Sequence, residues 1–186
     1  MVGAVRTGTV RRGSVRRRVR SLILLTCLVV GSGAVVAPAA GAVPKPGSTL
    51  TLETSSLLGY TDRVDLDPVG PSIGDIVTFR APVTRRGSAK DVGLMTGSLR
   101  NVVIDVPRAG SVMREVNLVF VLDGGRDELV VGGAAEYPAT APTLAQRTRT
   151  VRPLIGGSGR YAGARGDVVT VHRADDTWSH TFRFSD

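Results

Sequence analysis

The sequence predicts an all-β fold, and three features of this chain of 186 residues support the prediction. Ten prolines and 23 glycines interrupt the chain at short intervals. The apolar residues are rich in valine and fall in short runs, several of which alternate with polar residues as strands do. No long stretch shows the 3.6-residue period of an amphipathic helix. The part that follows the N-terminal segment, about 145 residues, suits a single domain.

The first 42 residues predict a secretory signal peptide. Seven of the 24 Lys and Arg residues lie before residue 21, an apolar run follows at 22–30, and small residues at 37–42 offer cleavage after Ala39 or Ala42. A retained membrane anchor is the less favoured alternative, because Gly31 and Gly33 interrupt the run short of the roughly 20 residues that a span needs. We therefore expect a secreted protein that has no membrane contact after cleavage.

The basic balance of the chain belongs to this segment. The remainder carries 17 basic and 16 acidic residues, so the formal net charge of +8 falls to +1 and predicts no nucleic-acid partner. The only cysteine, Cys27, lies in the apolar run. The mature chain should therefore hold no disulfide, no thiol nucleophile and no cysteine-based metal site.

Residues 43–48 form a proline-containing linker, and strands are expected from residue 49 onward. The first strand, 49–55, is expected to have one apolar face and one polar face. Leu50 and Leu52 lie on the apolar face, and Thr51, Glu53 and Ser55 lie on the polar face. Residues 57–74 lack periodicity and predict a loop. Further strands are expected at 75–83, 91–106, 112–122, 128–137, 148–155, 167–173 and 177–184. About eight strands joined by short turns are typical of a closed antiparallel barrel or a sandwich.

A glycine-rich corner separates two of these strands. Gly156, Gly157, Gly159 and Gly166 belong to a run of five glycines in eleven residues, which predicts structural turns with positive φ. Gly157 and Gly159 also fit a dinucleotide-binding pattern, but a β-branched run follows where that chemistry needs a helix. The sequence thus predicts a corner and no nucleotide cofactor.

The corner, 156–166, resembles the signature of the allene oxide cyclase and dirigent barrel proteins, especially their secreted bacterial branch. The segments 70–79 and 91–107 are similar to that family in order and spacing, so the resemblance spans about 49–184. It implies a single calycin-like domain, 49–186, built as an eight-stranded antiparallel barrel. An eight-stranded barrel can be filled by side chains or can hold one small ligand.

The resemblance also implies candidate site residues. Glu53 matches a first-strand glutamate that assists ring closure in plant allene oxide cyclases; a solvent-facing strand glutamate explains it equally well. The neighbouring pocket asparagine is replaced by Ser55, the strand-two asparagine aligns near Ala81, and the pocket tyrosine aligns near Ala135, for which Tyr137 is the expected substitute. These departures leave the plant reaction open.

Three further residues are candidates for the ligand pocket. Glu115 and Asn117 share one face of their strand, which is either the lumen or, more simply, the outer wall. Arg165 matches a pocket arginine of dirigent proteins, and a structural ion pair with Asp167 explains it equally well. The two histidines, His172 and His180, show no metal-ligand spacing, and His180 shares an aromatic face typical of a packed residue.

We therefore expect a secreted barrel that binds a small apolar molecule and acts as a cofactor-free cyclase or isomerase, with Glu53 as its polar anchor. The alternatives are a non-catalytic dirigent-type or lipid-binding barrel, and an envelope protein whose barrel is filled by side chains. The resemblance also implies possible self-association, since family members form dimers and trimers.

Overall fold

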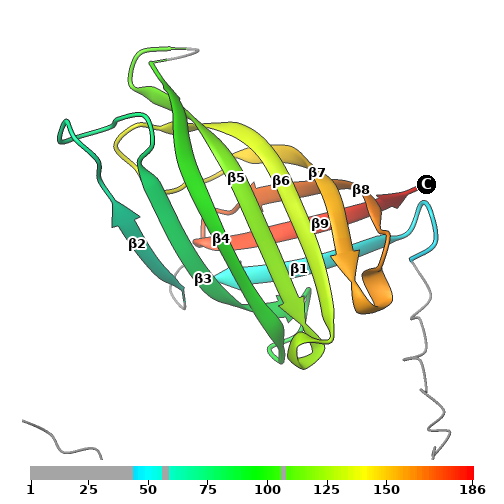
Figure 1. Cartoon of the computed structure of the whole chain (residues 1–186). Coiled ribbons are helices and arrows are strands. Elements are labelled where there is room, and N and C mark those ends of the chain that lie inside the picture. Colours follow the sequence, from blue (N-terminus) through cyan, green and yellow to red (C-terminus); the bar gives the residue numbers. More distant parts are fainter. Residues whose placement is uncertain (1–43, 56–58, 106–107) are drawn as a thin grey trace, which may run out of the picture. The chain divides into compact units, whose positions relative to one another are not determined.

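The computed structural model describes residues 44–55, 59–105 and 108–186 of the chain. The expected signal peptide, 1–42, and Cys27 within it lie outside these ranges. The described residues form two short 3₁₀ turns, η2 (Asp123–Gly125) and η3 (Gly159–Tyr161), and no α-helix. Figure 1 shows the strands, which are β1 (Thr49–Ser55), β2 (Tyr60–Val64), β3 (Ile76–Arg85), β4 (Asp91–Ile104), β5 (Ser111–Leu122), β6 (Asp127–Pro138), β7 (Arg149–Ser158), β8 (Arg165–His172) and β9 (Thr177–Ser185).

The strands form one antiparallel sheet that closes on itself. Its order is β1-β9-β8-β7-β6-β5-β4-β3-β2, and β1 also pairs with β3. In that closing pair Leu52 lies opposite Arg85 and Glu53 opposite Thr84. Strands β1 and β3 to β9 therefore make a closed barrel of eight strands, with β2 as one extra strand. The predicted all-β, eight-stranded antiparallel barrel is confirmed.

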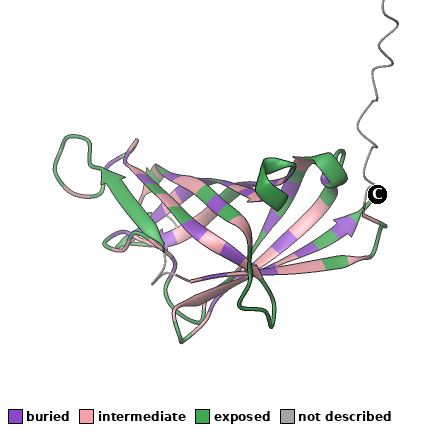
Figure 2. Ribbon diagram, turned by 90° about the horizontal axis from the view of Figure 1, so that it is seen from below, coloured by how far each residue is buried: buried purple, intermediate pink, exposed green. Residues whose placement is uncertain are grey.

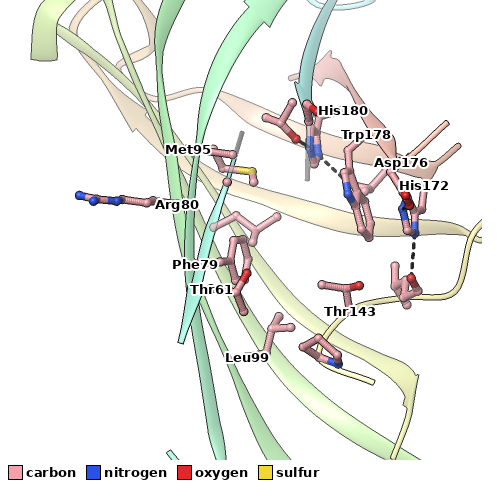
Figure 3. A pocket seen from close by; sticks show the side chains of 18 of the residues that line it. Thr61, Phe79, Arg80, Met95, Leu99, Thr143, His172, Asp176, Trp178 and His180 are labelled. Carbon is pink, nitrogen blue, oxygen red and sulfur yellow. Dashed lines mark hydrogen bonds and ion pairs between the residues drawn. The ribbon is translucent and has the colours of Figure 1, made fainter. Parts of the chain in front are cut away.

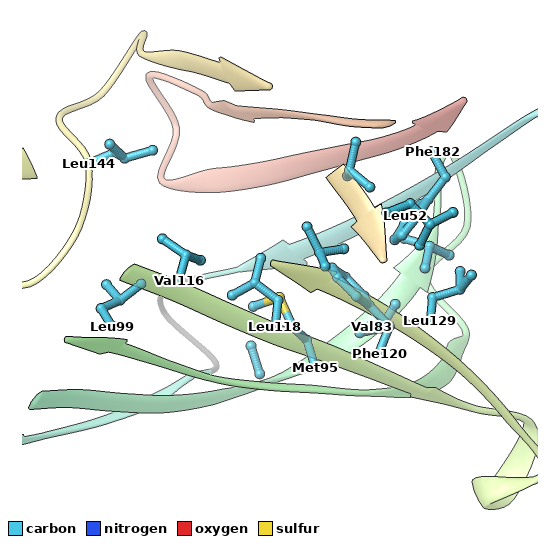
Figure 4. Packing of buried hydrophobic residues seen from close by; sticks show 14 of the residues in the cluster. Leu52, Val83, Met95, Leu99, Val116, Leu118, Phe120, Leu129, Leu144 and Phe182 are labelled. Atoms are coloured by element: carbon cyan, nitrogen blue, oxygen red, sulfur yellow. The ribbon is translucent and has the colours of Figure 1, made fainter. Parts of the chain in front are cut away.

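Alternation along the strands places the core inside the barrel. On β5, Val116, Leu118 and Phe120 are buried, whereas Glu115 and Asn117 on either side of Val116 are exposed. Figure 2 shows the same alternation of buried and exposed residues along the sheet. The largest buried rings, Phe120 and Phe182, meet edge to face with their centroids 5.1 Å apart. Figure 4 shows this apolar cluster inside the barrel, which extends from Phe120 and Phe182 to Met95, Leu99 and Leu118.

Strand β2 departs from the sequence-based expectation of a loop. It pairs with β3 from Tyr60 opposite Arg80 to Val64 opposite Ile76. All five of its residues are exposed, so neither face of β2 needs to be apolar. The sequence of β2 therefore shows no alternation of apolar and polar residues. Strand β2 thus pairs with the first half of β3, and β1 pairs with Thr84 and Arg85 at the end of β3.

The glycine corner lies between β7 and β8, as expected. Gly159 and Gly166 have φ of 60° and 137°, in the region that favours glycine. Gly156 and Gly157 lie at the end of β7 without positive φ, beside a bulge where β6 shifts register between Val130 and Val131. A Cβ on Gly157 would lie 2.5 Å from the Glu128 carbonyl oxygen, so this position needs glycine because two strands approach closely.

The segment before β1 is hydrogen-bonded to the end of β9. The expected linker is partly tied to the sheet, because the Gly47 amide donates to the Phe184 carbonyl at 2.8 Å and the Phe184 amide donates to Ser48 at 3.0 Å. In the described ranges, no helix has the length and apolar character needed to cross a membrane.

Candidate functional site

A cavity of about 300 Å³ opens at the end of the barrel where β1 finishes. Its rim is formed by Ser55 at the end of β1, by residues 59–61, by residues 142–144 of the β6–β7 loop and by the β8–β9 turn. This volume lies at the lower end of the range typical of small-molecule sites, roughly 300–1,000 Å³. Figure 3 shows side chains of β3 and β4 on one wall and of β8 and β9 on the other, with Arg80 pointing away from the cavity.

The wall on the side of β3 to β5 is apolar. These side chains occupy inward positions of consecutive strands, so the pleat brings them onto one surface. The apolar side chains of this wall are Phe79, Ala81, Met95, Leu99 and Leu118, and Leu144 of the β6–β7 loop lies beside them in the lining. Such a wall binds apolar surface without directional bonds, and orientation must come from the few polar groups beside it.

His180 is a polar group in the deep part of this cavity. It is 2% exposed, and its ring stands edge-on to Phe120 with the centroids 5.0 Å apart. Its Nδ1 lies 3.2 Å from the Thr170 hydroxyl and its Nε2 lies 3.4 Å from the Thr54 hydroxyl. Burial, helped by the nearby Arg152 cation, lowers the pKa of His180 to about 3. The ring is therefore neutral at physiological pH.

His172 lies at the rim. Its Nδ1 donates to the Leu144 carbonyl at 2.8 Å, and its Nε2 lies 3.2 Å from Asp176 Oδ1. The ring stacks on Trp178 with the centroids 3.9 Å apart and the planes 6° from parallel. Asp176 Oδ1 also accepts from Gln146 Nε2 at 2.8 Å. These contacts join the β6–β7 loop to the β8–β9 turn and give the cavity a fixed aromatic edge.

Arg152 of β7 lines the cavity and is 2% exposed. Its Nη2 donates to the Tyr137 hydroxyl at 2.9 Å and its Nη1 donates to the Thr150 hydroxyl at 2.7 Å. Its Nε is buried and has no hydrogen-bond partner among the described residues. Burial raises the pKa of Tyr137, although the two nearby guanidinium groups oppose this, so Tyr137 is a neutral partner for Arg152.

A second buried arginine, Arg114 of β5, holds the loop at the rim. It donates to the carbonyl oxygens of Ala141 and Pro142, each at 2.9 Å, and from Nε to Asn101 Oδ1 at 2.8 Å. Asn101 Nδ2 in turn donates to Asp75 at 3.3 Å. Arg114 is thus linked to a carboxylate through Asn101 and has a structural function.

Asp75 completes this network at the start of β3. Burial alone would raise its pKa, but hydrogen bonds from the Ser72 and Leu66 amides and from the Ser72 hydroxyl, with the Arg63 cation, lower it to about 2. The Arg63 guanidinium lies 3.3 Å from the carboxylate. The ionised Asp75 therefore anchors the segment between β2 and β3.

The chain is similar to known proteins in fold and not in sequence. The chain matches no protein-family model, and no curated protein matches it in sequence. Among solved structures, pyocyanin demethylase aligns with a TM-score of 0.56 and 20% identity, over 74% of this chain and 100% of that one. The chain shares the barrel fold of pyocyanin demethylase.

Two further solved structures align less closely. The pterocarpan synthase dirigent protein has a TM-score of 0.49 and 14% identity, over 73% of this chain and 84% of that one. The exo-specific intermolecular Diels-Alderase AbnU has a TM-score of 0.47 and 15% identity, over 73% of this chain and 97% of that one.

Of the residues expected at the site, two lie at the cavity or beside it. Ser55 is on its rim. Tyr137 is 4% exposed inside the barrel and reaches the cavity through its bond with Arg152.

Four others lie on the outer face. Glu53 points away from the lumen and pairs with Arg173 at 2.7 Å, while Glu115 pairs with Arg100. Asn117 is exposed, and Arg165 donates to the carbonyl oxygens of Ile155 and Ala164. Glu53, the expected polar anchor, is thus not among the residues that line the described cavity, and the lumenal face of β1 carries Leu52 and Thr54.

Sequence reasoning missed Arg114 and Arg152, although a signal for both was present. Arg114 lies midway between Val112 and Val116, and Arg152 lies two residues before Leu154. Each therefore shares the face of apolar residues that are buried, and an arginine at such a position is enclosed with them. The alternating pattern that located the strands also placed these two cations inside the barrel.

Proposed function

We propose that the barrel binds a small, largely apolar organic molecule in the cavity at its rim and promotes a cofactor-free cyclisation or isomerisation of that molecule. The observation that carries this proposal is the cavity itself: an apolar wall from β3 to β5 facing a few fixed polar groups. Such a site can hold a flexible molecule in one conformer, and pre-orientation alone can supply a large part of a rate enhancement. The resemblance to allene oxide cyclases supports the same reaction class.

A non-catalytic, dirigent-type or lipid-binding barrel is the second candidate, and a specific observation favours it. A neutral histidine with a pKa of about 3 is a weak base at neutral pH, and Glu53 lies outside the cavity. The described cavity therefore offers positioning and a buried cation rather than a matched acid and base. Any catalysis would depend on confinement and on electrostatic stabilisation by Arg152.

Binding is tested with 1-aminoanthracene, an uncharged apolar fluorophore. We expect a saturable fluorescence increase with the wild-type protein and its loss in Ala81→Trp, because Ala81 is buried in the cavity wall and an indole there fills the space. Thr78→Trp places the same side chain on the exposed face of β3 and should bind the probe normally. Equal binding by both variants would show that the probe binds elsewhere and would refute the cavity as the site.

Catalysis is tested separately. The protein is incubated with unsaturated fatty-acid epoxides and with phenolic compounds, and the mixtures are followed by liquid chromatography and mass spectrometry. An isomerase converts a substrate into a product of unchanged mass and different retention, and the conversion should disappear in Ala81→Trp. Saturable binding with every compound recovered unchanged would favour the non-catalytic barrel.

A further inference from the structure

Arg152 is a buried cation for which the described residues supply no counter-ion. The described ranges contain all 16 acidic residues of the chain, and in the ion pairs that these residues form the basic partners are Arg63, Arg100, Arg108, Arg126, Arg160, His172, Arg173 and Arg183. The two hydrogen bonds of Arg152 go to neutral hydroxyls. An isolated buried charge is unfavourable, and proteins normally pair it.

The second buried arginine, Arg114, differs from Arg152 in how fully its guanidinium is hydrogen-bonded. Both arginines are almost fully buried, at 3% and 2% exposure. Arg114 donates to three acceptors and reaches the Asp75 carboxylate through Asn101. A guanidinium has five N–H donors, and Arg152 uses two of them, which leaves its Nε without an acceptor in the described structure. Arg114 therefore serves the fold, whereas Arg152 retains unused bonding capacity beside the cavity.

The surroundings of Arg152 favour an anion. The other ionisable side chains that line the cavity are Arg80, which points outward, Tyr60, which is exposed, His172 and Asp176 at the rim, and His180. Asp176 is already held by His172 and Gln146. His180 is neutral, and the positive charge of Arg152 contributes to lowering its pKa. The deep part of the cavity is thus electropositive and its wall is apolar.

We propose that the molecule bound in this cavity is a carboxylic acid, whose carboxylate pairs with Arg152 while its apolar remainder lies against the wall formed by Phe79, Met95, Leu99 and Leu118. The inference rests on the proposed function, since it names the class of ligand for the same cavity. The guanidinium fork matches a carboxylate, and the pairing is charge-assisted. Tyr137 and Thr150 hold the guanidinium in place for this contact.

The test compares acids with alcohols of the same skeleton. Decanoic acid is paired with 1-decanol and 3-phenylpropanoic acid with 3-phenylpropan-1-ol, and each displaces 1-aminoanthracene from the wild-type protein at a pH where the acids are ionised. We expect each acid to compete at least roughly 10-fold better than its alcohol, the scale of one charge-assisted contact. Acids that compete no better than their alcohols, or not at all while the fluorophore binds, would overturn the inference.

Three variants assign the preference to Arg152. Arg152→Gln should weaken displacement by the acids roughly 30-fold or more while the alcohols change little, because only the buried charge is lost. Arg152→Lys should recover part of the acid preference. Arg149→Gln removes the same charge from the exposed face of β7 and should behave as wild type. An acid preference that survives in Arg152→Gln would contradict the proposal.

The outcomes separate this inference from the proposed function. If the fluorophore binds and Ala81→Trp abolishes its binding, the cavity is a ligand site whatever the acids do. If Arg152→Gln and Arg152→Lys both lose acids and alcohols together, Arg152 maintains the shape of the cavity and the carboxylate inference fails. If the fluorophore does not bind to the wild-type protein, the proposed function itself fails and the inference fails with it.

Discussion

At the scale of single residues, His180 couples the pH of the solution to the stability of the barrel. The ring is enclosed by β1, β8 and Phe120, and it remains neutral because burial lowers its pKa from 6.5 to about 3. Between these two values the unfolded chain binds a proton that the folded chain does not. The free energy of unfolding must therefore fall as the pH falls through this range.

The prediction compares the pH dependence of wild type with that of His180→Gln. Between pH 6.5 and 4.5 the wild-type free energy of unfolding should fall more steeply, by up to about 1.4 kcal/mol per pH unit from this one group. Urea denaturation at a series of pH values measures the difference in slope. The Asp75 contribution does not interfere, because its folded pKa of about 2 places the loss below about pH 4. Parallel curves for the two proteins would show that His180 is protonated in the folded state.

Strand β1 shows which part of the site could be predicted from the sequence and which part could not. Alternation in 49–55 divided the side chains of β1 into two faces correctly, and Leu52 and Thr54 mark the inner one. The resemblance assigned a pocket function to Glu53 on the other face. Only the structure supplies its actual partner, Arg173, which is 120 residues away in the sequence. Pairings of that kind depend on how the strands close, and local patterns do not encode them.

At the scale of elements, the glycine corner shows which glycines the fold requires. Gly166 has φ of 137°, and a Cβ there would collide with the Arg183 carbonyl oxygen on β9. Gly156 has no positive φ, and a Cβ there would meet only Arg165 Nη1 at 3.8 Å. Both glycines were predicted as structural turn residues, but their environments differ.

Gly166→Ala should therefore lower the free energy of unfolding by about 2–4 kcal/mol, since backbone strain and a steric clash add together. Gly156→Ala should change it by less than about 1 kcal/mol, as is usual where the backbone and the space both accept a methyl group. Urea denaturation midpoints at neutral pH measure both. Equal effects of the two substitutions would mean that β8 can move away from β9 at the corner without cost.

The elements themselves were predictable where one face is buried. Strands β5 and β6 closely match the predicted runs 112–122 and 128–137, because alternation between core and solvent is strong there. Strand β2 was missed because both its faces are exposed and its sequence carries no such constraint.

At the scale of the whole barrel, the end of β1 contributes both to closure of the sheet and to the lining of the cavity. Among the described residues, two pairs join β1 to β3, and the first half of β3 pairs with β2. Ser55 at the end of β1 and Tyr60 and Thr61 of β2 form part of the cavity rim. Phe120 and Phe182 are fully buried inside the barrel. One sheet thus supplies both a packed core and a ligand-sized space.

We propose that residues 1–42 direct secretion, and the residues that form the barrel begin after them: the first hydrogen bonds in the described chain involve Lys45 and Gly47. Cleavage after Ala39 or Ala42 would leave every described contact intact. Expression of the full chain in a bacterium should release a protein whose intact mass corresponds to a start at Ala40 or Val43. Replacing Ala37, Ala39, Ala40 and Ala42 by bulky residues should block release, because signal cleavage needs small side chains at these positions. Recovery of the uncleaved chain from the membrane fraction of the wild-type culture would instead support the retained anchor.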